Sequence, residues 1–297
     1  MKRLALFLLA CLLTNPAHAG EPGVQQTIAY VKKLQTEGGG FRAQQPKPGA
    51  PDIAPTLGAT SSAARALHYL GAEVPNKEAC IKFVESCHDR KSGGFGQTPD
   101  GKPDVFTTAV GLMAVVELKM PLDKYADGAN KYLSENAKTF EEIRIAAAGF
   151  EAIKSKAPKA SQWSDAILRT YNKENGMFGK GPGMARDTAS AEVTMHRLIG
   201  RSPYAGVVLD VLKNGQRQNG GWGKADSEIA SDLETTYRVM RCFVMLKARP
   251  TNVEGVRSFV AKCRNEDGGY AVAPGQPSSV SGTYFASIIL HWLKQTP

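Results

Sequence analysis

Residues 216–222 read Gln-Arg-Gln-Asn-Gly-Gly-Trp, and the glycine–aromatic end of this stretch recurs along the chain. The same signature, in one copy with methionine for the second glycine, stands at 39–41, 93–95, 176–178, 220–222 and 268–270. The aromatic positions are separated by 54, 83, 44 and 48 residues, so the long interval holds two periods and the copy near Phe140 has lost its glycines. Repetition at this period predicts stacked helical hairpins or the blades of a propeller.

Proline is a second and independent marker of the repeat. It stands at positions 75, 121, 158, 203, 250 and 297, with a mean spacing of about 44 residues. The chain has 297 residues, and six units of this length account for nearly all of those that follow residue 19. We therefore expect residues 20–297 to form a single domain of six repeats, each about 45 residues long.

Each unit carries the periodicity of two helices. The first helix has one apolar stripe, as residues 24–34 show with Val24, Ile28, Val31 and Leu34. The second helix is apolar around more of its circumference, as in 105–118, 233–246 and 280–293, which is typical of a buried helix. The absence of alternating β-strand patterns excludes a propeller. Each unit is thus predicted to be an outer helix, a glycine loop and a buried inner helix.

The last helix indicates how the hairpins assemble. An open solenoid needs polar caps at both ends, whereas residues 283–290 are largely apolar. We therefore predict an all-α (α/α)6 toroid, in which the last hairpin packs on the first and the inner helices surround a central cavity. Four aspartates stand 9 to 11 residues after a loop aromatic and are predicted to cap inner helices: Asp52, Asp104, Asp187 and Asp232.

The N-terminal segment has the pattern of a secretory signal peptide. Lys2 and Arg3 precede an apolar run over 4–13, which is too short to span a membrane, and 17–19 read Ala-His-Ala, a cleavage signal. We expect cleavage before Gly20 and a secreted or periplasmic protein.

Charge and cysteine content exclude several other classes of protein. The net charge of +9 comes from scattered basic residues rather than from the stripe or tail of a nucleic-acid-binding protein. No later apolar run is long enough to span a membrane. The cysteines that follow residue 19 contain no C-x-x-C pair, so we expect buried free thiols rather than a structural zinc cluster.

The repeat resembles that of the α/α-toroid superfamily of protein prenyltransferase β subunits and terpenoid cyclases. Residues 216–222 fit the Q-x3-G-x-W repeat of the cyclases, and 35–41 fit it with phenylalanine for tryptophan. Residues 179–184 resemble the prenyltransferase loop G-x-x-P-G-M, and 142–144 resemble the D-x-R that opens the third inner helix of those β subunits. The resemblance covers essentially the whole chain after residue 19 and is far more specific for the fold than for an activity.

The resemblance implies a zinc site, but the matching residues differ here. Prenyltransferases hold zinc with the aspartate and cysteine of a D-x-C motif and with a histidine of the next inner helix. Asp232 matches the aspartate, whereas Glu234 replaces the cysteine and Gly282 replaces the histidine. Asp187 replaces a histidine that binds diphosphate and would repel that group. We expect no metal or other cofactor, no prenyl-diphosphate turnover and no α-type partner subunit; the cyclase motif D-x-D-D is also absent.

The helix register of the family implies which side chains face the cavity. They are mostly apolar or small, with one acid and two arginines: Phe106, Thr107, Val110, Arg144, Ile145, Ala148, Ala189, Ser190, Val193, Glu234, Thr235, Arg238, Ser281, Gly282 and Phe285. Glu234 and Arg238 are four residues apart and can pair on one helix face. Either they only neutralise each other, or Arg144 and Arg238 anchor the polar end of a ligand whose apolar part contacts Phe106 and Phe285.

Three functions follow from this lining. The first is a binding protein without catalysis, whose partner is an apolar, isoprenoid-like or amphiphilic small molecule or a peptide. The second is a transferase or cyclase with a rearranged site, for which Asp232 and Glu234 are the catalytic candidates. The third is a carbohydrate-active (α/α)6 enzyme, with paired carboxylates drawn from Asp226, Glu228, Asp232 and Glu234. The scarcity of aromatic residues for stacking on sugars argues against the third.

Overall fold

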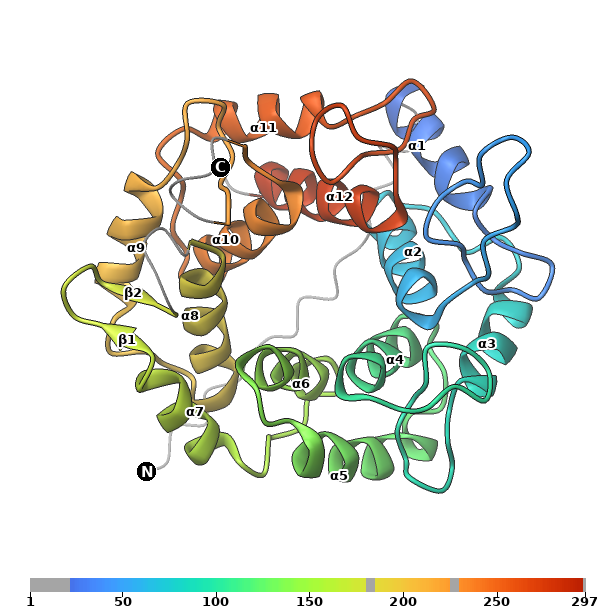
Figure 1. Cartoon of the computed structure of the whole chain (residues 1–297), viewed down its shortest axis with the longest axis horizontal. Coiled ribbons are helices and arrows are strands. Elements are labelled where there is room, and N and C mark those ends of the chain that lie inside the picture. The colour runs from blue at the N-terminus through green and yellow to red at the C-terminus, as the bar shows by residue number, and fades with distance from the viewer. Residues whose placement is uncertain (1–21, 180–184, 225–229, 296–297) are drawn as a thin grey trace, which may run out of the picture.

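The helices of this computed structural model form two concentric rings (Figure 1). The structure describes residues 22–179, 185–224 and 230–295. Within these ranges, the outer ring consists of α1 (Pro22–Lys32), α3 (Lys77–Ser86), α5 (Ala126–Asn136), α7 (Ala160–Leu168), α9 (Ala205–Asn214) and α11 (Val253–Lys262). The inner ring consists of α2 (Leu57–Tyr69), α4 (Val105–Glu117), α6 (Phe140–Ala152), α8 (Ala185–Ile199), α10 (Leu233–Met245) and α12 (Val280–Gln295). The predicted (α/α)6 toroid is confirmed.

The ring closes where the last hairpin meets the first. The inner helix α12 packs against both α2 and α1. Thr27 on α1 donates a hydrogen bond to the carbonyl oxygen of Gly268 at 2.8 Å, and the Arg264 guanidinium donates to the carbonyl oxygen of Gly23 at 3.1 Å. These bonds join residues about 240 positions apart in sequence, so the two ends of the repeat array form one continuous seam.

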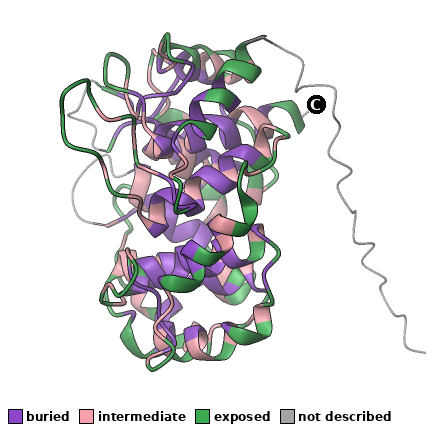
Figure 2. Cartoon of the chain, turned by 90° about the vertical axis from the view of Figure 1, so that its right-hand side faces the viewer, coloured by how far each residue is buried: buried purple, intermediate pink, exposed green. Residues whose placement is uncertain are grey.

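Hydrogen bonds join each glycine–aromatic loop to the inner helix that follows it. All five loop aromatics are buried: Phe41, Phe95, Phe178, Trp222 and Tyr270. The backbone N–H of each donates to a threonine hydroxyl in the first turns of the following inner helix, over 2.9 to 3.2 Å, the acceptors being Thr60, Thr108, Thr188, Thr236 and Thr283. Figure 2 shows the buried segments concentrated along the helices, with more of the exposed ones in the loops.

The predicted helix caps are right at two of four positions. Asp104 and Asp232 cap α4 and α10, each accepting a backbone N–H at 2.7 Å. Asp52 does not cap α2, which begins five residues later at Leu57 and is capped by Thr56. Proline at position 55 disfavours a helical conformation for the residue before it, so the helix cannot start at Asp52. Asp187 lies within the first turn of α8 rather than before it.

The remaining departures from the expected pattern are small. The repeat without glycines joins α5 to α6 through residues 137–139, and Thr139 caps α6. A two-residue antiparallel hairpin, β1 (Tyr171–Asn172) and β2 (Met177–Phe178), interrupts the all-helical pattern, and the short 3-10 helix η2 (Leu122–Lys124) precedes α5.

The four described cysteines are buried free thiols. No helix in the described ranges combines the length and apolar character needed to cross a membrane. The expected signal peptide lies outside the described residues.

Candidate functional site

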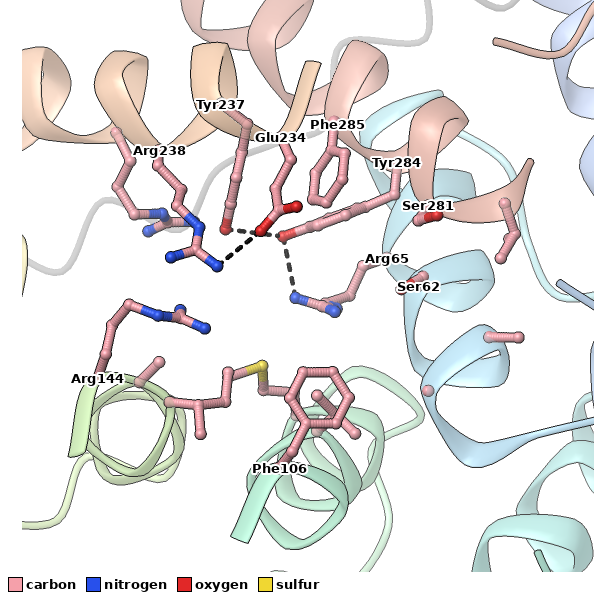
Figure 3. Close-up of a pocket in the computed structure, with 18 of the residues that line it drawn as sticks. Ser62, Arg65, Phe106, Arg144, Glu234, Tyr237, Arg238, Ser281, Tyr284 and Phe285 are labelled. Carbon is pink, nitrogen blue, oxygen red and sulfur yellow. Dashed lines mark hydrogen bonds and ion pairs between the residues drawn. The ribbon is translucent and has the colours of Figure 1, made fainter. Parts of the chain in front are cut away.

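The inner helices enclose a cavity of about 570 Å³ at the centre of the ring. Eleven of the fifteen side chains expected to face it line it, among them Phe106, Arg144, Glu234, Arg238 and Phe285 (Figure 3). The other four are absent from the lining: Thr107, Ala189, Thr235 and Gly282.

These four residues are turned towards the body of the protein. The Thr235 hydroxyl bonds to Asp232 at 2.7 Å, and a Cβ at Gly282 would lie 2.8 Å from the Ala271 backbone. Both carboxylate oxygens of Asp232 accept hydrogen bonds from Thr235, and Asp232 does not line the cavity. The third position after the cap therefore faces the loop at Thr107, Thr235 and Gly282, whereas Ile145 and Ser190 at the matching positions line the cavity.

One wall of the cavity is apolar. It comes mainly from α4 and α6, which lie opposite α10 and α12 across the ring (Figure 1). Its residues are Phe106, Val110, Met113, Ile145, Ala148 and Ala152. Phe106 is 48% exposed although it lies on a helix of the inner ring, so its ring is available to a molecule in the cavity. This wall is suited to contact with an aliphatic chain.

Four charged residues form an ion-pair network near the loop end of the cavity, here called the rim network: Glu141, Arg144, Glu234 and Arg238. Arg238 donates to Glu234 at 2.6 Å and to Glu141 at 2.8 Å, and Arg144 donates to Glu141 at 2.9 Å. Burial raises the pKa of Glu141, but the hydrogen bond from Arg238 and the charge of Arg144 outweigh it and lower that pKa to about 2. Two guanidinium groups thus face two carboxylates, so the positive charges of Arg144 and Arg238 are neutralised within the rim network.

A second charged group lies deeper in the cavity, here called the deep cluster: Arg65, Glu151, Arg197, Tyr237, Arg241 and Tyr284. Arg241 follows Glu234 by seven residues, which places it about 10 Å further along α10. Arg65 donates to the Tyr284 hydroxyl at 2.9 Å, and the two tyrosine hydroxyls are 3.4 Å apart (Figure 3). Arg197 pairs with Glu151 at 2.8 Å.

Aromatic rings hold Arg241 in place within the deep cluster. Its guanidinium carbon lies 5.0 Å from the centre of the Trp292 ring and 5.5 Å from that of Tyr237. Burial by itself raises the pKa of Tyr237, but the charges of Arg241 and Arg65 reverse this and lower it below its ordinary value. The positive charges of Arg241 and Arg65 thus act directly on the Tyr237 hydroxyl.

Sequence reasoning missed the deep cluster and Glu141. The family register was followed only to the sixth position after each cap, whereas Arg65 and Arg241 both occupy the ninth, after caps Thr56 and Asp232. Continuing the helical period by one turn would have found both. Glu141 precedes Arg144 by three residues, a spacing that favours an ion pair on a helix.

The model of the prenyltransferase alpha-alpha toroid domain matches residues 4–74, 63–148 and 130–296, so the matches run over almost the entire sequence. This chain belongs to that family. No curated protein sequence matches it significantly.

Solved structures share the toroid at low sequence identity. The type II terpene cyclase MstE from Scytonema superposes with a TM-score of 0.64 at 10% identity, over 93% of this chain and 97% of the cyclase. Protein geranylgeranyltransferase-I of Candida albicans in complex with GGPP gives 0.62 at 12% identity, over 79% and 83% of the two chains. A structure described as a wild-type glycosidase gives 0.64 at 11% identity, over 95% and 98%. At these identities the likeness concerns the fold.

The residues at the prenyltransferase zinc positions do not fit a zinc ion in this family member. Asp232 is occupied as a helix cap, and Glu234 is bound to Arg238. Gly282 supplies no side chain and packs against the backbone of Ala271. Asp187, which matches the diphosphate-binding histidine, pairs with Arg186 at 3.3 Å. Among the described residues, no group of three or more histidine, cysteine, aspartate or glutamate side chains is arranged to hold a metal.

Proposed function

We propose that this toroid binds an amphiphilic molecule with an apolar, isoprenoid-like chain in its central cavity and does not transfer or cyclise that chain. The observation that carries the proposal is the division of the cavity into an apolar wall, formed by α4 and by Ile145, Ala148 and Ala152 of α6, and a wall rich in arginine and tyrosine on α2, α10 and α12. Arg144 and Glu151 of α6 belong to the charged groups at the two levels of the cavity. A volume of about 570 Å³ lies within the range of small-molecule sites. The signal-peptide pattern of residues 1–19 supports a site of action outside the cytoplasm.

The solved relatives support the choice of an isoprenoid chain. A variant of the cyclase MstE was solved with its substrate geranylgeranyl dihydroxybenzoate, and the Candida transferase with GGPP. Both molecules join a long apolar chain to a polar end. A peptide fits this cavity less well, because its backbone N–H and C=O groups need hydrogen-bond partners that the apolar wall of α4 and α6 does not provide.

The carboxylates near the cavity argue against catalysis. A carboxyl group acts as a general acid only if it is protonated near the working pH. The pKa of Glu141 is held at about 2, and Glu234 is bound to Arg238. Of the carboxylates considered for a glycosidase, Asp232 caps α10 and Glu234 is bound to Arg238, whereas Asp226 and Glu228 lie outside the described residues.

Binding is tested with the neutral prenyl alcohol farnesol, titrated calorimetrically and followed by native mass spectrometry. We expect one molecule per chain. Ala148→Trp, which places a bulky ring inside the cavity, should weaken binding about tenfold or more, since it removes the space for the chain. Val116→Trp is the matched control, because Val116 is exposed and does not line the cavity. Equal affinity of both variants and the wild type would place the binding elsewhere.

Catalysis is tested separately with geranylgeranyl diphosphate. We expect no release of diphosphate, with or without added Zn²⁺, and no stoichiometric zinc by elemental analysis of the purified protein. Diphosphate release that requires zinc and stops on chelation would restore the enzyme interpretation.

A further inference from the structure

We infer that the deep cluster is an oxyanion site, which receives the carboxylate or phosphate head of the bound amphiphile. This inference rests on the proposed function and deepens it by stating the chemistry of the head and its position. The head would lie at Arg65 and Arg241 rather than at the rim network, with the chain along the apolar wall of α4 and α6.

The first argument is the balance of charge at the two levels of the cavity. The rim network sets two arginines against two carboxylates, and its hydrogen bonds join all four groups. The deep cluster sets Arg65, Arg197 and Arg241 against Glu151, which is already bound to Arg197. Two guanidinium groups, those of Arg65 and Arg241, are therefore left without a carboxylate partner among the described residues. An anion is attracted to the level where positive charge is uncompensated.

The second argument concerns the hydrogen-bonding groups of Arg241. Its Nε atom is buried and has no hydrogen-bond partner within the described part of the chain. A buried N–H of a charged group that lacks an acceptor is costly, and an oxygen in the cavity would satisfy it. Stacking on Trp292 fixes the plane of the guanidinium, so the donor is already oriented.

The third argument is the supply of further donors next to Arg241. The hydroxyls of Tyr237 and Tyr284 are 3.4 Å apart, and both residues line the cavity. Arg65 contacts the Tyr284 hydroxyl at 2.9 Å and can donate from its other nitrogens. Two guanidinium groups and two phenols form a set of donors suited to an anion with two or more oxygens, which a carboxylate and a phosphate both possess.

The test compares three ligands with one chain: farnesol, farnesoic acid and farnesyl monophosphate. We expect the two anions to bind the wild type about tenfold or more tightly than farnesol, as a charge-assisted hydrogen bond allows. The tighter of the two anions identifies the head as carboxylate or phosphate. Arg241→Gln should reduce the preference for the anions over farnesol to near unity, because it weakens the binding of the anions far more than that of the neutral alcohol. The double variant Glu234→Gln/Arg238→Gln, the matched rim control, removes one charge of each sign and should preserve the preference.

The outcomes separate the two proposals. If farnesol and both anions bind the wild type equally, the oxyanion site is wrong and chain binding stands. If none of the three binds, both are wrong. If Glu234→Gln/Arg238→Gln abolishes the preference and Arg241→Gln preserves it, the head lies at the rim network instead. Circular dichroism checks that Arg241→Gln folds, and Arg65→Gln gives the same test of the deep cluster if it does not.

Discussion

Trp222 shows at the scale of one residue how the repeat builds its core. Its side chain is fully buried, its indole N–H donates to the carbonyl oxygen of Leu212 at 2.8 Å, and its ring centre lies 5.9 Å from that of Phe243. Trp222→Ala should therefore lower the free energy of unfolding by about 3–5 kcal/mol, as truncation of a large core aromatic does. Urea denaturation measures the loss. A loss below about 1 kcal/mol would show that the indole is not a core element.

Glu141 should make the stability of the protein depend on pH in the acidic range. Its folded pKa of about 2 lies below the ordinary value of a glutamate, so its contribution to stability is complete above pH about 4.5. The contribution is lost as pH falls from there towards 2, because the carboxylate protonates and its bonds to Arg144 and Arg238 weaken. Thermal unfolding of the wild type and Glu141→Gln should differ at pH 6 and converge towards pH 2. A difference independent of pH would contradict the assignment.

The helix caps show, at the scale of one element, what local sequence can and cannot specify. Asp232 accepts the backbone N–H of Thr235, whereas Asp52 stands outside α2 and pairs with Arg42 in an exposed contact. Asp232→Ala should cost about 1 kcal/mol, in the range of lost N-caps. Asp52→Ala should produce no resolvable loss, because exposed ion pairs contribute little. Chemical denaturation of both variants checks the pair; an equal loss would mean that the cap is not the source of the effect.

The inner helices were predictable as elements because their apolar period and glycine loops are encoded locally. The positions of α4 and α10 agree with the sequence prediction to within a residue, and α2 differs only where Pro55 delays its start. The threonine that accepts each loop aromatic N–H was not anticipated, although it recurs five times at the start of an inner helix. A threonine within a helix has no distinctive local signal, and its role depends on the loop that folds back onto it.

At the scale of the whole molecule, the closed ring could be predicted from the sequence, whereas the chemistry of its cavity could be predicted only in part. Period and the apolar last helix predicted closure, because both are properties of the chain itself. The deep cluster depends on five different inner helices: α2 supplies Arg65, α6 supplies Glu151, α8 supplies Arg197, α10 supplies Tyr237 and Arg241, and α12 supplies Tyr284. Their convergence is a property of the closed ring. The helical register places Arg65 and Arg241 on the cavity side of their own helices, but no spacing along the sequence shows that residues of separate helices meet.

Closure itself can be tested at the seam between the last and first hairpins. Gly268 and Gly275 both have positive φ, +85° and +79°, so alanine at either site is strained by a similar amount. A Cβ at Gly268 would lie 2.6 Å from the carbonyl oxygen of Gln26 on α1, whereas one at Gly275 would meet nothing within 4 Å. Gly268→Ala should therefore force α1 away from the ring and cost about 1–3 kcal/mol more than Gly275→Ala, the range for overpacking in a tight contact. Urea unfolding gives the two free energies, and hydrogen exchange should show α1 losing protection in Gly268→Ala alone. Equal losses of stability with α1 still protected would contradict this. They would mean that the seam accommodates the added methyl group without opening, and that this contact does not hold the first hairpin in place.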